Sequence, residues 1–345
     1  MLRRIALTMG DVAGIGPEVI VRAWRDGSLS TRRRLVVVGH PDVLRRAIHL
    51  VGEQLTVQPI ERIDAAMESA DSIPCWNPAN DEAARVRPGV NDARAGRAAF
   101  DWLAAATRAA LAGQVDAIVT APLSKAALHL GGLPYPGHTE ILAEICGIRD
   151  FAMMLYLPGI SLERGKTHCL GVVHATLHTS IKSVPTLLNT PGIIEKVRLL
   201  ARFLESLAVD QPRIAVCALN PHAGEDGLFG DEERTTIEPA VESAARDGIC
   251  VTGPLPADSV FQRAVAGEFD GVVAMFHDQG HIALKLIGLR KAVNVTLGLP
   301  IVRTSPSHGT AFDIAWKGVA RPDGMIEAIR VAVALADRKL LDAGR

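Results

Sequence analysis

The sequence lacks the features that mark nucleic-acid-binding and membrane-spanning proteins. Its 37 Lys and Arg residues are balanced by 38 Asp and Glu residues, for a formal net charge of -1. No long basic block of the kind that follows a phosphate backbone stands out. No apolar run reaches 18 residues, which a membrane-spanning helix requires. We therefore expect no nucleic-acid partner and no membrane partner.

Cysteine is scarce and is not arranged as a metal-binding motif. The five cysteines are scattered, odd in number and mostly embedded in apolar runs: Cys75, Cys146, Cys169, Cys217 and Cys250. Reduced thiols in a cytoplasmic protein are the simplest interpretation. An expected strand begins at Ile5 with no apolar signal-peptide segment before it, which also favours the cytoplasm.

What the sequence does contain is an alternation of short apolar runs and periodic segments. The expected strands lie near residues 5–8, 35–39, 117–120, 169–173, 214–219 and 271–274, and the expected helices include 93–111, 193–206, 233–247 and 325–341. This alternation predicts an α/β fold with a mostly parallel sheet covered by helices on both faces. A chain of 345 residues is long enough for two domains that share a cleft, and the breaker-rich stretch 131–137 is a plausible crossover between them.

Three of the expected strands run into turns that contain histidine. His277, His222 and the pair His174 and His178 each follow a different strand. In open α/β sheets ligands bind at the carboxyl ends of the strands, and three neutral imidazoles around a divalent cation leave positions open for substrate. A single histidine is more often structural, but repetition at three strand ends favours a metal site.

Other polar residues also lie near strand ends or helix starts. Lys125 follows another strand, and Asp11 lies in a Gly-rich turn whose spacing matches neither a dinucleotide-binding fingerprint nor a Walker loop. His138 and Thr139 open a helix, where backbone N–H groups favour a phosphate. The alternatives are a solvated lysine, a structural turn and, at Asp258, a simple helix N-cap.

Several long motifs occur in a fixed order along the chain. They are Pro136-Gly137-His138-Thr139-Glu140, Asn220-Pro221-His222-Ala223-Gly224-Glu225, His277-Asp278-Gln279-Gly280, and Asn294 through Pro300 followed by Arg303-Thr304-Ser305. Together they resemble the motifs of the 4-hydroxythreonine-4-phosphate dehydrogenase (PdxA) family. The matching segments run from Gly10 to Gly318, so the resemblance covers nearly the whole chain.

The resemblance implies an oxidoreductase of the family named for pyridoxal phosphate biosynthesis. Its reaction would be metal-dependent, NAD-dependent oxidation of a secondary alcohol beta to a carboxylate, followed by decarboxylation. The metal would be Zn, Mg, Co or Mn, and the substrate a small anion that is phosphorylated. A cytoplasmic homodimer is implied, with an active site that is shared between the subunits.

The resemblance also implies a two-domain α/β/α fold like that of isocitrate and isopropylmalate dehydrogenases, with mostly parallel sheets. Residues 1–135 and 300–345 would form a discontinuous nucleotide-side domain. Residues 136–299 would form the metal and substrate domain, with the active site in the cleft between the two.

The family's site residues carry over to matching positions of this sequence. The implied metal ligands are His178, His222 and His277, and His174 is an alternative to His178, because the family's usual Pro two residues after this histidine is absent. The implied substrate-binding residues, which contact the phosphate, are His138, Thr139, Lys285, Asn294 and Arg303. Asp258 and Lys125 are implied as the catalytic residues that transfer a proton or orient the substrate.

The segment from Ser307 to Gly318 resembles the adenine-side nucleotide loop of isocitrate and isopropylmalate dehydrogenases. The implied cofactor-binding residues are His308, Gly309, Thr310 and Asp313. Phe312 and Trp316 stand where those relatives carry smaller residues, which leaves a shifted cofactor pose open.

Three alternative functions stay open. Two belong to the same family: 4-phospho-threonate or phospho-erythronate dehydrogenase, and aromatic (terephthalate-type) cis-dihydrodiol dehydrogenase. His281 stands where the vitamin-pathway enzymes tend to carry an aliphatic residue, which favours a catabolic member. The third is a phosphate-acetyltransferase-like or binding protein on a related fold, which needs neither the three histidines nor the nucleotide loop.

Overall fold

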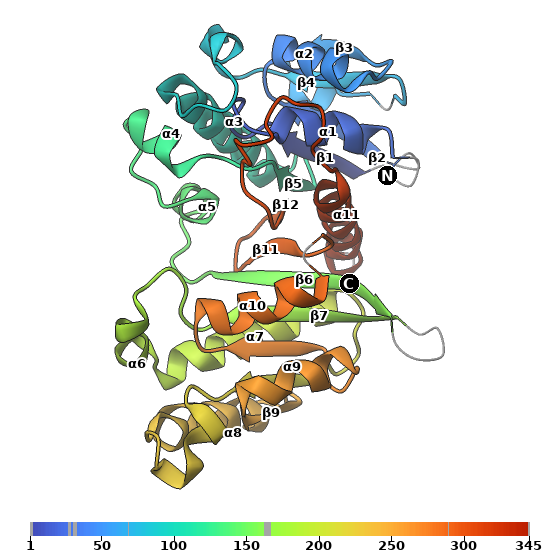
Figure 1. Cartoon of the computed structure of the whole chain (residues 1–345). Helices are drawn as coiled ribbons and strands as arrows, with labels where there is room; N and C mark the ends of the chain where they lie inside the picture. The colour runs from blue at the N-terminus through green and yellow to red at the C-terminus, as the bar shows by residue number, and fades with distance from the viewer. Residues whose placement is uncertain are drawn as a thin grey trace. The chain divides into compact units, whose positions relative to one another are not determined.

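The chain divides into two units by its internal contacts. The first comprises Met1–Phe151 and Leu299–Arg345, and the second comprises Ala152–Gly298 (Figure 1). This computed structural model describes residues 3–26, 29, 33–67, 69–161, 167–288 and 290–343. The discontinuous first unit means that both ends of the chain contribute to one sheet.

The sheet of the first unit is parallel throughout. Its strands lie in the order β3 (Thr56–Ile60), β4 (Ser72–Trp76), β2 (Arg33–Val38), β1 (Arg3–Thr8), β5 (Ala117–Thr120) and β12 (Val302–Pro306). Each neighbouring pair is parallel, and β1 and β5 are almost wholly buried. Continuous apolar strands of this kind are typical of a sheet covered on both faces.

The helices of the first unit are α1 (Gly16–Trp24), α2 (Pro41–Val51), α3 (Ala93–Leu111), α4 (Lys125–Leu130), α5 (His138–Cys146) and α11 (Asp323–Ala343), with short turns η2 (Ile63–Ala65) and η3 (Asp81–Arg85). Two of them begin as local sequence chemistry dictates. The Asp92 side chain accepts from the N–H of Arg94 at α3, and Ser124 accepts from the N–H of Ala127 at α4. Such N-caps satisfy donors that have no partner inside the helix.

The sheet of the second unit is mixed. Its order is β11 (Val293–Leu297), β6 (Ala152–Ser161), β7 (Thr167–His174), β10 (Gly271–Ala274), β8 (Ile214–Cys217) and β9 (Val251–Leu255). Strand β6, which was not among the expected strands, is antiparallel to both of its neighbours, and the remaining pairs are parallel. The predicted α/β class with mostly parallel sheets is thus confirmed.

The helices of the second unit are α6 (Val184–Leu187), α7 (Thr190–Ser206), α8 (Glu238–Arg246), α9 (Ala257–Val265) and α10 (His277–Gly288), with short turns η5 (Ile181–Ser183), η6 (Pro221–Gly227) and η7 (Glu233–Ile237). One buried apolar cluster joins α9 and α10 to strands β6, β7, β8 and β10, and Val172, Val260 and Leu284 are among its fully buried members. This packing fixes the direction of α10, whose first residue is His277.

The expected boundary between the domains at residue 136 is wrong, because α5 belongs to the first unit. The stretch before α5 does not leave the unit: the ring of Tyr135 stacks on Phe100 of α3 at 5.7 Å, and its hydroxyl donates to Glu144 of α5 at 2.9 Å. The unit boundary lies instead at Phe151. Residues 344 and 345 of the expected nucleotide-side domain lie outside the described residues.

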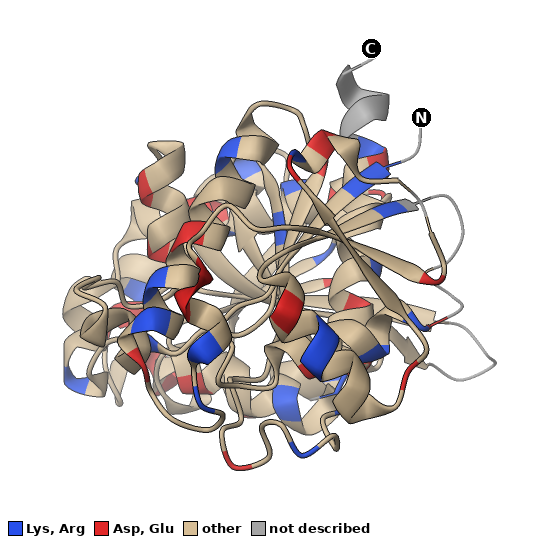
Figure 2. Ribbon diagram, turned by 90° about the horizontal axis from the view of Figure 1, so that it is seen from above, with Lys and Arg blue, Asp and Glu red and all other residues tan. Residues whose placement is uncertain are grey.

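Charge and hydropathy agree with the sequence pattern. Acidic and basic residues are interleaved over helices and loops in Figure 2. Within the part of the chain that the structure describes, no helix is both long and apolar enough to cross a membrane.

Gly96 sets how closely α3 approaches α4, and thereby where Lys125 lies. A Cβ at this position would be 2.0 Å from the carbonyl oxygen of Ala127. In an exposed helix, alanine stabilises the fold by about 1 kcal/mol relative to glycine. Overpacking a side chain against the backbone destabilises the fold by about 1–3 kcal/mol. Gly96→Ala should therefore lower the urea concentration at the midpoint of unfolding. Arg108→Ala on the exposed face of α3 is the control. A midpoint at or above that of the wild type would contradict this packing.

Candidate active site

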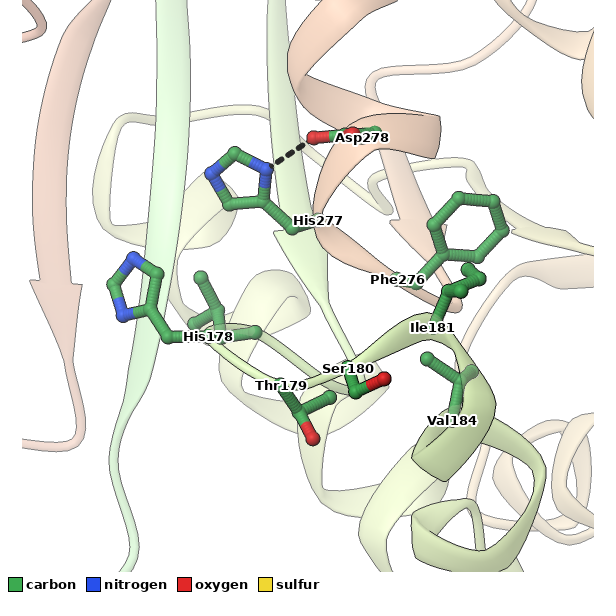
Figure 3. Close-up of a pocket in the computed structure, with 9 residues that line it drawn as sticks. His178, Thr179, Ser180, Ile181, Val184, Phe276, His277 and Asp278 are labelled. Carbon is green, nitrogen blue, oxygen red and sulfur yellow. Dashed lines mark hydrogen bonds and ion pairs between the residues drawn. The ribbon is translucent and has the colours of Figure 1, made fainter.

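A pocket in the second unit lies where β7 and β10 end. It is lined by Leu177, His178, Thr179, Ser180, Ile181, Val184, Phe276, His277 and Asp278. Figure 3 shows the imidazoles of His178 and His277 side by side, one from the loop after β7 and the other from the first turn of α10. Their ring centroids are 5.8 Å apart. The carboxyl ends of two neighbouring parallel strands therefore bring two of the three predicted metal ligands together.

Hydrogen bonds between side chains and the backbone fix the turn between β10 and His277. The Gln279 side chain accepts from the N–H of Met275 at 2.7 Å and donates to the carbonyl of Ala218, after β8, at 2.8 Å. The hydroxyl of Thr176 donates to the carbonyl of Met275 at 2.8 Å. One amide and one hydroxyl thus tie together the ends of three adjacent strands.

The ring of His277 is oriented from two sides. Its Nδ1 lies 2.7 Å from a carboxylate oxygen of Asp278, and its face stacks on His281 with centroids 3.8 Å apart. A carboxylate on one ring nitrogen selects the tautomer whose other nitrogen, Nε2, carries a lone pair. That arrangement suits a metal ligand.

A buried histidine pair lies beneath His277. Nδ1 of His281 and Nε2 of His174 are 3.1 Å apart, and both residues are less than a tenth exposed. Burial, with the neighbouring imidazoles, lowers the pKa of His174 to about 4 and that of His281 to about 3. Both rings are therefore neutral at neutral pH. The alternative ligand His174 lies inside the fold, whereas His178 lines the pocket.

His222 lies in an unusual backbone segment. Residues 222–226 all have positive φ, with His222 at 51°, although non-glycine residues in this region cost about 1–2 kcal/mol each. Glu233 holds the segment's start, because one of its carboxylate oxygens accepts the N–H groups of Leu219 and Asn220, each at 2.8 Å. Burial alone would raise the pKa of Glu233, but these hydrogen bonds outweigh it and lower that pKa. His222 itself is exposed.

No group of three His, Cys, Asp or Glu side chains among the described residues is arranged to hold a metal ion. The donor set fits a divalent cation in part: two adjacent imidazoles, one of them with a carboxylate on its second nitrogen. One chain of the described structure thus assembles His178 and His277 but not His222.

The other predicted residues of the second unit lie elsewhere in it. Asp258 is exposed in the first turn of α9, whose N-cap is Pro256, so the N-cap alternative for Asp258 is wrong. Lys285 lines a separate groove between α10 and β6. Asn294, on β11, has a buried side-chain oxygen without a hydrogen-bond partner, which leaves an acceptor for a ligand.

In the first unit, predicted substrate-binding residues gather at the end of β5. Arg303 is 2% exposed and donates to the hydroxyl of Thr120 at 2.7 Å, while Nε2 of His138 is 3.2 Å from the carbonyl of Ala121. Burial lowers the pKa of Arg303 to about 10, so it stays cationic at neutral pH. Burial and the charge of Arg303 hold the pKa of His138 well below its usual value. A neutral imidazole and a buried cation therefore lie together at the start of α5.

Lys125 and Thr139 complete this group. Lys125 is the exposed first residue of α4, and its Cε would be 3.8 Å from a Cβ at Gly137, just before α5. Thr139 follows His138 in the first turn of α5 and is partly buried. The ammonium of Lys125 and the N–H groups of α5 thus border the same region as Arg303.

The predicted nucleotide loop packs on the Gly-rich turn that precedes α1. The carbonyl of Thr310 accepts from the N–H of Ile15 at 3.0 Å. His308 is partly buried, its Nδ1 is 3.1 Å from the carbonyl of Gly309, and burial lowers its pKa. Gly309 and Asp313 are exposed. All four predicted cofactor residues therefore lie on one loop of the first unit.

Asp11 lies in the same Gly-rich turn and is fully buried. Oδ1 accepts the N–H of Ala13 at 2.8 Å, while Oδ2 has no hydrogen-bond partner. Burial is the main reason that its pKa is raised to about 6, with a smaller contribution from Asp92. Such a perturbed carboxyl group is a candidate for a functional role.

Comparison with known proteins supports the family resemblance that the sequence motifs indicated. The sequence profile of the family described as "Pyridoxal phosphate biosynthetic protein PdxA" matches residues 31–332. The chain belongs to the PdxA family. It is 43% identical to D-threonate 4-phosphate dehydrogenase of Pectobacterium atrosepticum, over 97% of this chain and 100% of that protein.

Two solved structures resemble this PdxA-family chain over almost its whole length. The crystal structure of 4-hydroxythreonine-4-phosphate dehydrogenase from Klebsiella pneumoniae is 44% identical, with a TM-score of 0.84 over 97% of this chain and 99% of that one. A terephthalate 1,2-cis-dihydrodiol dehydrogenase from Burkholderia xenovorans is 32% identical, with a TM-score of 0.65 over 96% of this chain and 98% of that one. The predicted fold and family are therefore confirmed, and the chain is a PdxA-family dehydrogenase.

The sequence did not predict the structural roles of the residues that hold the PdxA-family motifs in place. These are Glu18, Glu233, Gln279 and the pair of His174 and His281, of which His174 was predicted only as a possible metal ligand and His281 only as a sign of a catabolic member. Their contacts join positions far apart in the chain, such as His174 and His281, which are separated by 107 residues. The one signal in the sequence that could have identified these residues is the presence of a polar residue inside an apolar or Gly-rich motif.

The buried carboxyl of Asp11 should make stability depend on pH. Its folded-state pKa of about 6 is above the ordinary 3.8, so its contribution is greatest below pH 3.8 and is lost as the pH rises through 6. Asp11→Asn cannot ionise. The stability of this variant relative to wild type should rise by about 2 kcal/mol between pH 4.5 and pH 7.5, measured by urea unfolding. A difference that is constant with pH would show that Asp11 is not desolvated.

Proposed function

We propose that this PdxA-family dehydrogenase carries out the NAD-dependent and metal-dependent oxidation of a phosphorylated β-hydroxy acid, followed by loss of the carboxylate. The observation that carries the proposal is the pairing of His178 and His277 at adjacent strand ends, with Asp278 on Nδ1 of His277. A divalent cation held by these histidines would supply Lewis-acid stabilisation of negative charge on the substrate oxygens, and NAD would supply the hydride acceptor.

The chain's own residues would bind and orient the anionic ends of the substrate. Arg303 is a buried, permanent cation, and His138 and Thr139 lie where α5 presents backbone N–H groups. Charge-assisted contacts from a guanidinium and a helix start suit a phosphate group. Lys285 and Asn294 are proposed as further substrate contacts, and the buried free oxygen of Asn294 would accept from a substrate hydroxyl or amine.

Proton transfer is proposed for the exposed ammonium of Lys125 or the carboxylate of Asp258. Lys125 lies beside the start of α5, next to the proposed phosphate contacts. Asp258 presents its carboxylate from the first turn of α9. The carboxylate of Asp258, or Lys125 after it has lost one proton to become a neutral amine, would take the alcohol proton. The protonated group would then return a proton to the enolate.

Among the family's substrates we favour D-threonate 4-phosphate. It is the substrate named for the 43% identical relative from Pectobacterium atrosepticum, and His281 is the residue that favoured a catabolic member. The second candidate is 4-hydroxythreonine 4-phosphate, because the relative from Klebsiella pneumoniae is 44% identical. An aromatic cis-dihydrodiol has no phosphate, so it would not make the phosphate contacts proposed for Arg303, His138 and Thr139.

A panel of the three substrates with NAD and Zn²⁺, Mg²⁺, Co²⁺ or Mn²⁺ tests this proposal. We expect reduction of NAD and release of carbon dioxide with D-threonate 4-phosphate at the highest kcat/KM. No turnover of any β-hydroxy acid, together with binding of acetyl phosphate or coenzyme A, would favour an acyltransferase-like protein instead.

The histidine pair should be required for metal binding. His277→Ala should lower both metal affinity and turnover by at least about a hundredfold, because a site with three protein ligands loses one. Metal affinity is measured by competition with a chromophoric chelator, and circular dichroism checks the fold. His49→Ala, at an exposed histidine of α2, is the control. Full metal occupancy in His277→Ala would remove this residue from the ligand set.

We propose further that the third ligand, His222, reaches the pocket from the second subunit of a homodimer. Mixing His277→Ala with His222→Ala subunits should then restore about one quarter of wild-type activity, since half of the dimers are mixed and each holds one intact site. Mixing His277→Ala with His178→Ala should restore nothing, because both residues come from one chain. An active monomer in sedimentation would exclude a shared site.

Arg303 should discriminate between the substrates. Arg303→Lys keeps the charge but loses the planar fork that binds two phosphate oxygens. KM for the phosphorylated substrate should rise about tenfold, which corresponds to about 1.4 kcal/mol. Inorganic phosphate should inhibit the variant less than the wild type. Arg108→Lys on α3 is the control, and unchanged KM and phosphate inhibition would show that another group binds there.

A further inference from the structure

The carboxylate of Glu18 has no place in the proposed chemistry, yet it is completely buried in the first turn of α1. One of its oxygens accepts the backbone N–H of Trp316, and the other accepts the backbone N–H of Gly318 at 3.0 Å. These partners are about 300 positions away and lie at the end of the predicted nucleotide loop. A buried carboxylate that accepts two main-chain N–H groups is a strong, directional anchor.

A second side chain of α1 holds the same point. Arg22, one helical turn after Glu18, donates to the carbonyl of Gly318 at 2.5 Å. Gly318 is thus bonded through both its N–H and its carbonyl. The loop needs this support, because Trp316 has a φ of 58° and Gly318 a φ of 69°, and a non-glycine residue in this conformation persists only when its surroundings hold it.

The other end of the loop is bonded to the turn that precedes α1. The N–H of Ile15 donates to the carbonyl of Thr310, and the indole of Trp316 donates to the carbonyl of Val12 at 2.8 Å. Gly14 allows the close approach, since a Cβ there would be 2.9 Å from the carbonyl oxygen of Thr310. The loop from Thr310 to Gly318 is therefore held to the Gly-rich turn and α1 by five hydrogen bonds.

Trp316 fills a structural role in this arrangement. Its ring lies under the guanidinium of Arg46 from α2, with 5.1 Å between the guanidinium carbon and the ring. The large residue that departs from the isocitrate and isopropylmalate dehydrogenase pattern thus packs between α2 and the Gly-rich turn. It adds an anchor that a smaller residue could not provide.

We propose that Glu18 is a positioning residue for the cofactor: its carboxylate sets the conformation of residues 310–318, and through them the residues that contact NAD. This inference rests on the proposed NAD dependence. Glu18 touches no reacting atom, so its loss should weaken cofactor binding while the chemical step is preserved.

The test compares Glu18→Gln with the wild type. The amide keeps one acceptor and turns its NH2 group toward the second backbone N–H, where two donors repel. We expect KM for NAD to rise at least about tenfold, as for the loss of one charge-assisted contact, with kcat and the KM of the substrate changed less than about twofold. Hydrogen–deuterium exchange of residues 307–318 should become faster. Glu61→Gln, at an exposed glutamate of the same unit, should change none of these.

Two further variants keep the inference testable if Glu18→Gln does not fold. Arg22→Met removes the contact to the carbonyl of Gly318. Trp316→Phe removes the indole bond to Val12 and weakens the contact with Arg46. Each should raise the hydrogen–deuterium exchange rate of residues 307–318 and the KM for NAD. Unchanged exchange and unchanged KM in the folded variants would overturn the role of Glu18, as would a fall in kcat alone. If the wild type binds no NAD, the proposed function fails, and the exchange measurement alone then decides whether Glu18 anchors the loop.

Discussion

Buried carboxylates that accept main-chain N–H groups hold the site loops of both units in place. The loops that follow the strands leave backbone donors without a partner in the sheet, and a buried donor left unpaired costs as much as a lost hydrogen bond. Glu18 meets this demand for Trp316 and Gly318, and Glu233 meets it for Leu219 and Asn220. Each carboxylate stabilises a loop that also contains left-handed residues, which would otherwise relax to more common conformations.

The two units surround their proposed ligands with different electrostatics. In the second unit the rings of His174, His281 and His277 lie against one another, and burial keeps the first two neutral. Gly280 makes this stack possible, since a Cβ there would be 2.6 Å from Nε2 of His174. A neutral, stacked support orients His277 without adding a positive charge that would oppose a bound cation.

The proposed anion site of the first unit contains a buried cation, Arg303, whereas the second unit has stacked neutral imidazoles. Arg303 lies within hydrogen-bonding distance of Thr120, and its charge helps to keep His138 neutral. Burying a guanidinium is costly unless a counter-charge compensates it. Glu140 of α5 favours the charged form of Arg303 and so compensates part of this cost. The phosphate of the proposed substrate would add a further counter-charge.

Local signals in the sequence were enough to predict the α/β class, the strands that carry the candidate site residues at their carboxyl ends, and the family. Apolar runs and helical periodicity are local signals, so β1, β5, β8, β10 and α3 were predictable. Long motifs, such as the one that begins at His277, identify a family without any knowledge of contacts. That His178 and His277 lie close together was also predictable, because both residues follow strands of one sheet.

The contacts that hold those residues in place could not be predicted from the sequence, because they depend on long-range packing. The bonds from Glu18 to Trp316 and from His281 to His174 join segments that are about 300 and 107 positions apart, and no local periodicity encodes such a contact. The assignment of α5 to the first unit depended on the stacking of Tyr135 on Phe100, while the glycines before it suggested a crossover. Contacts of this kind arise when a whole unit packs, since burial and the pairing of polar groups are settled together across the fold.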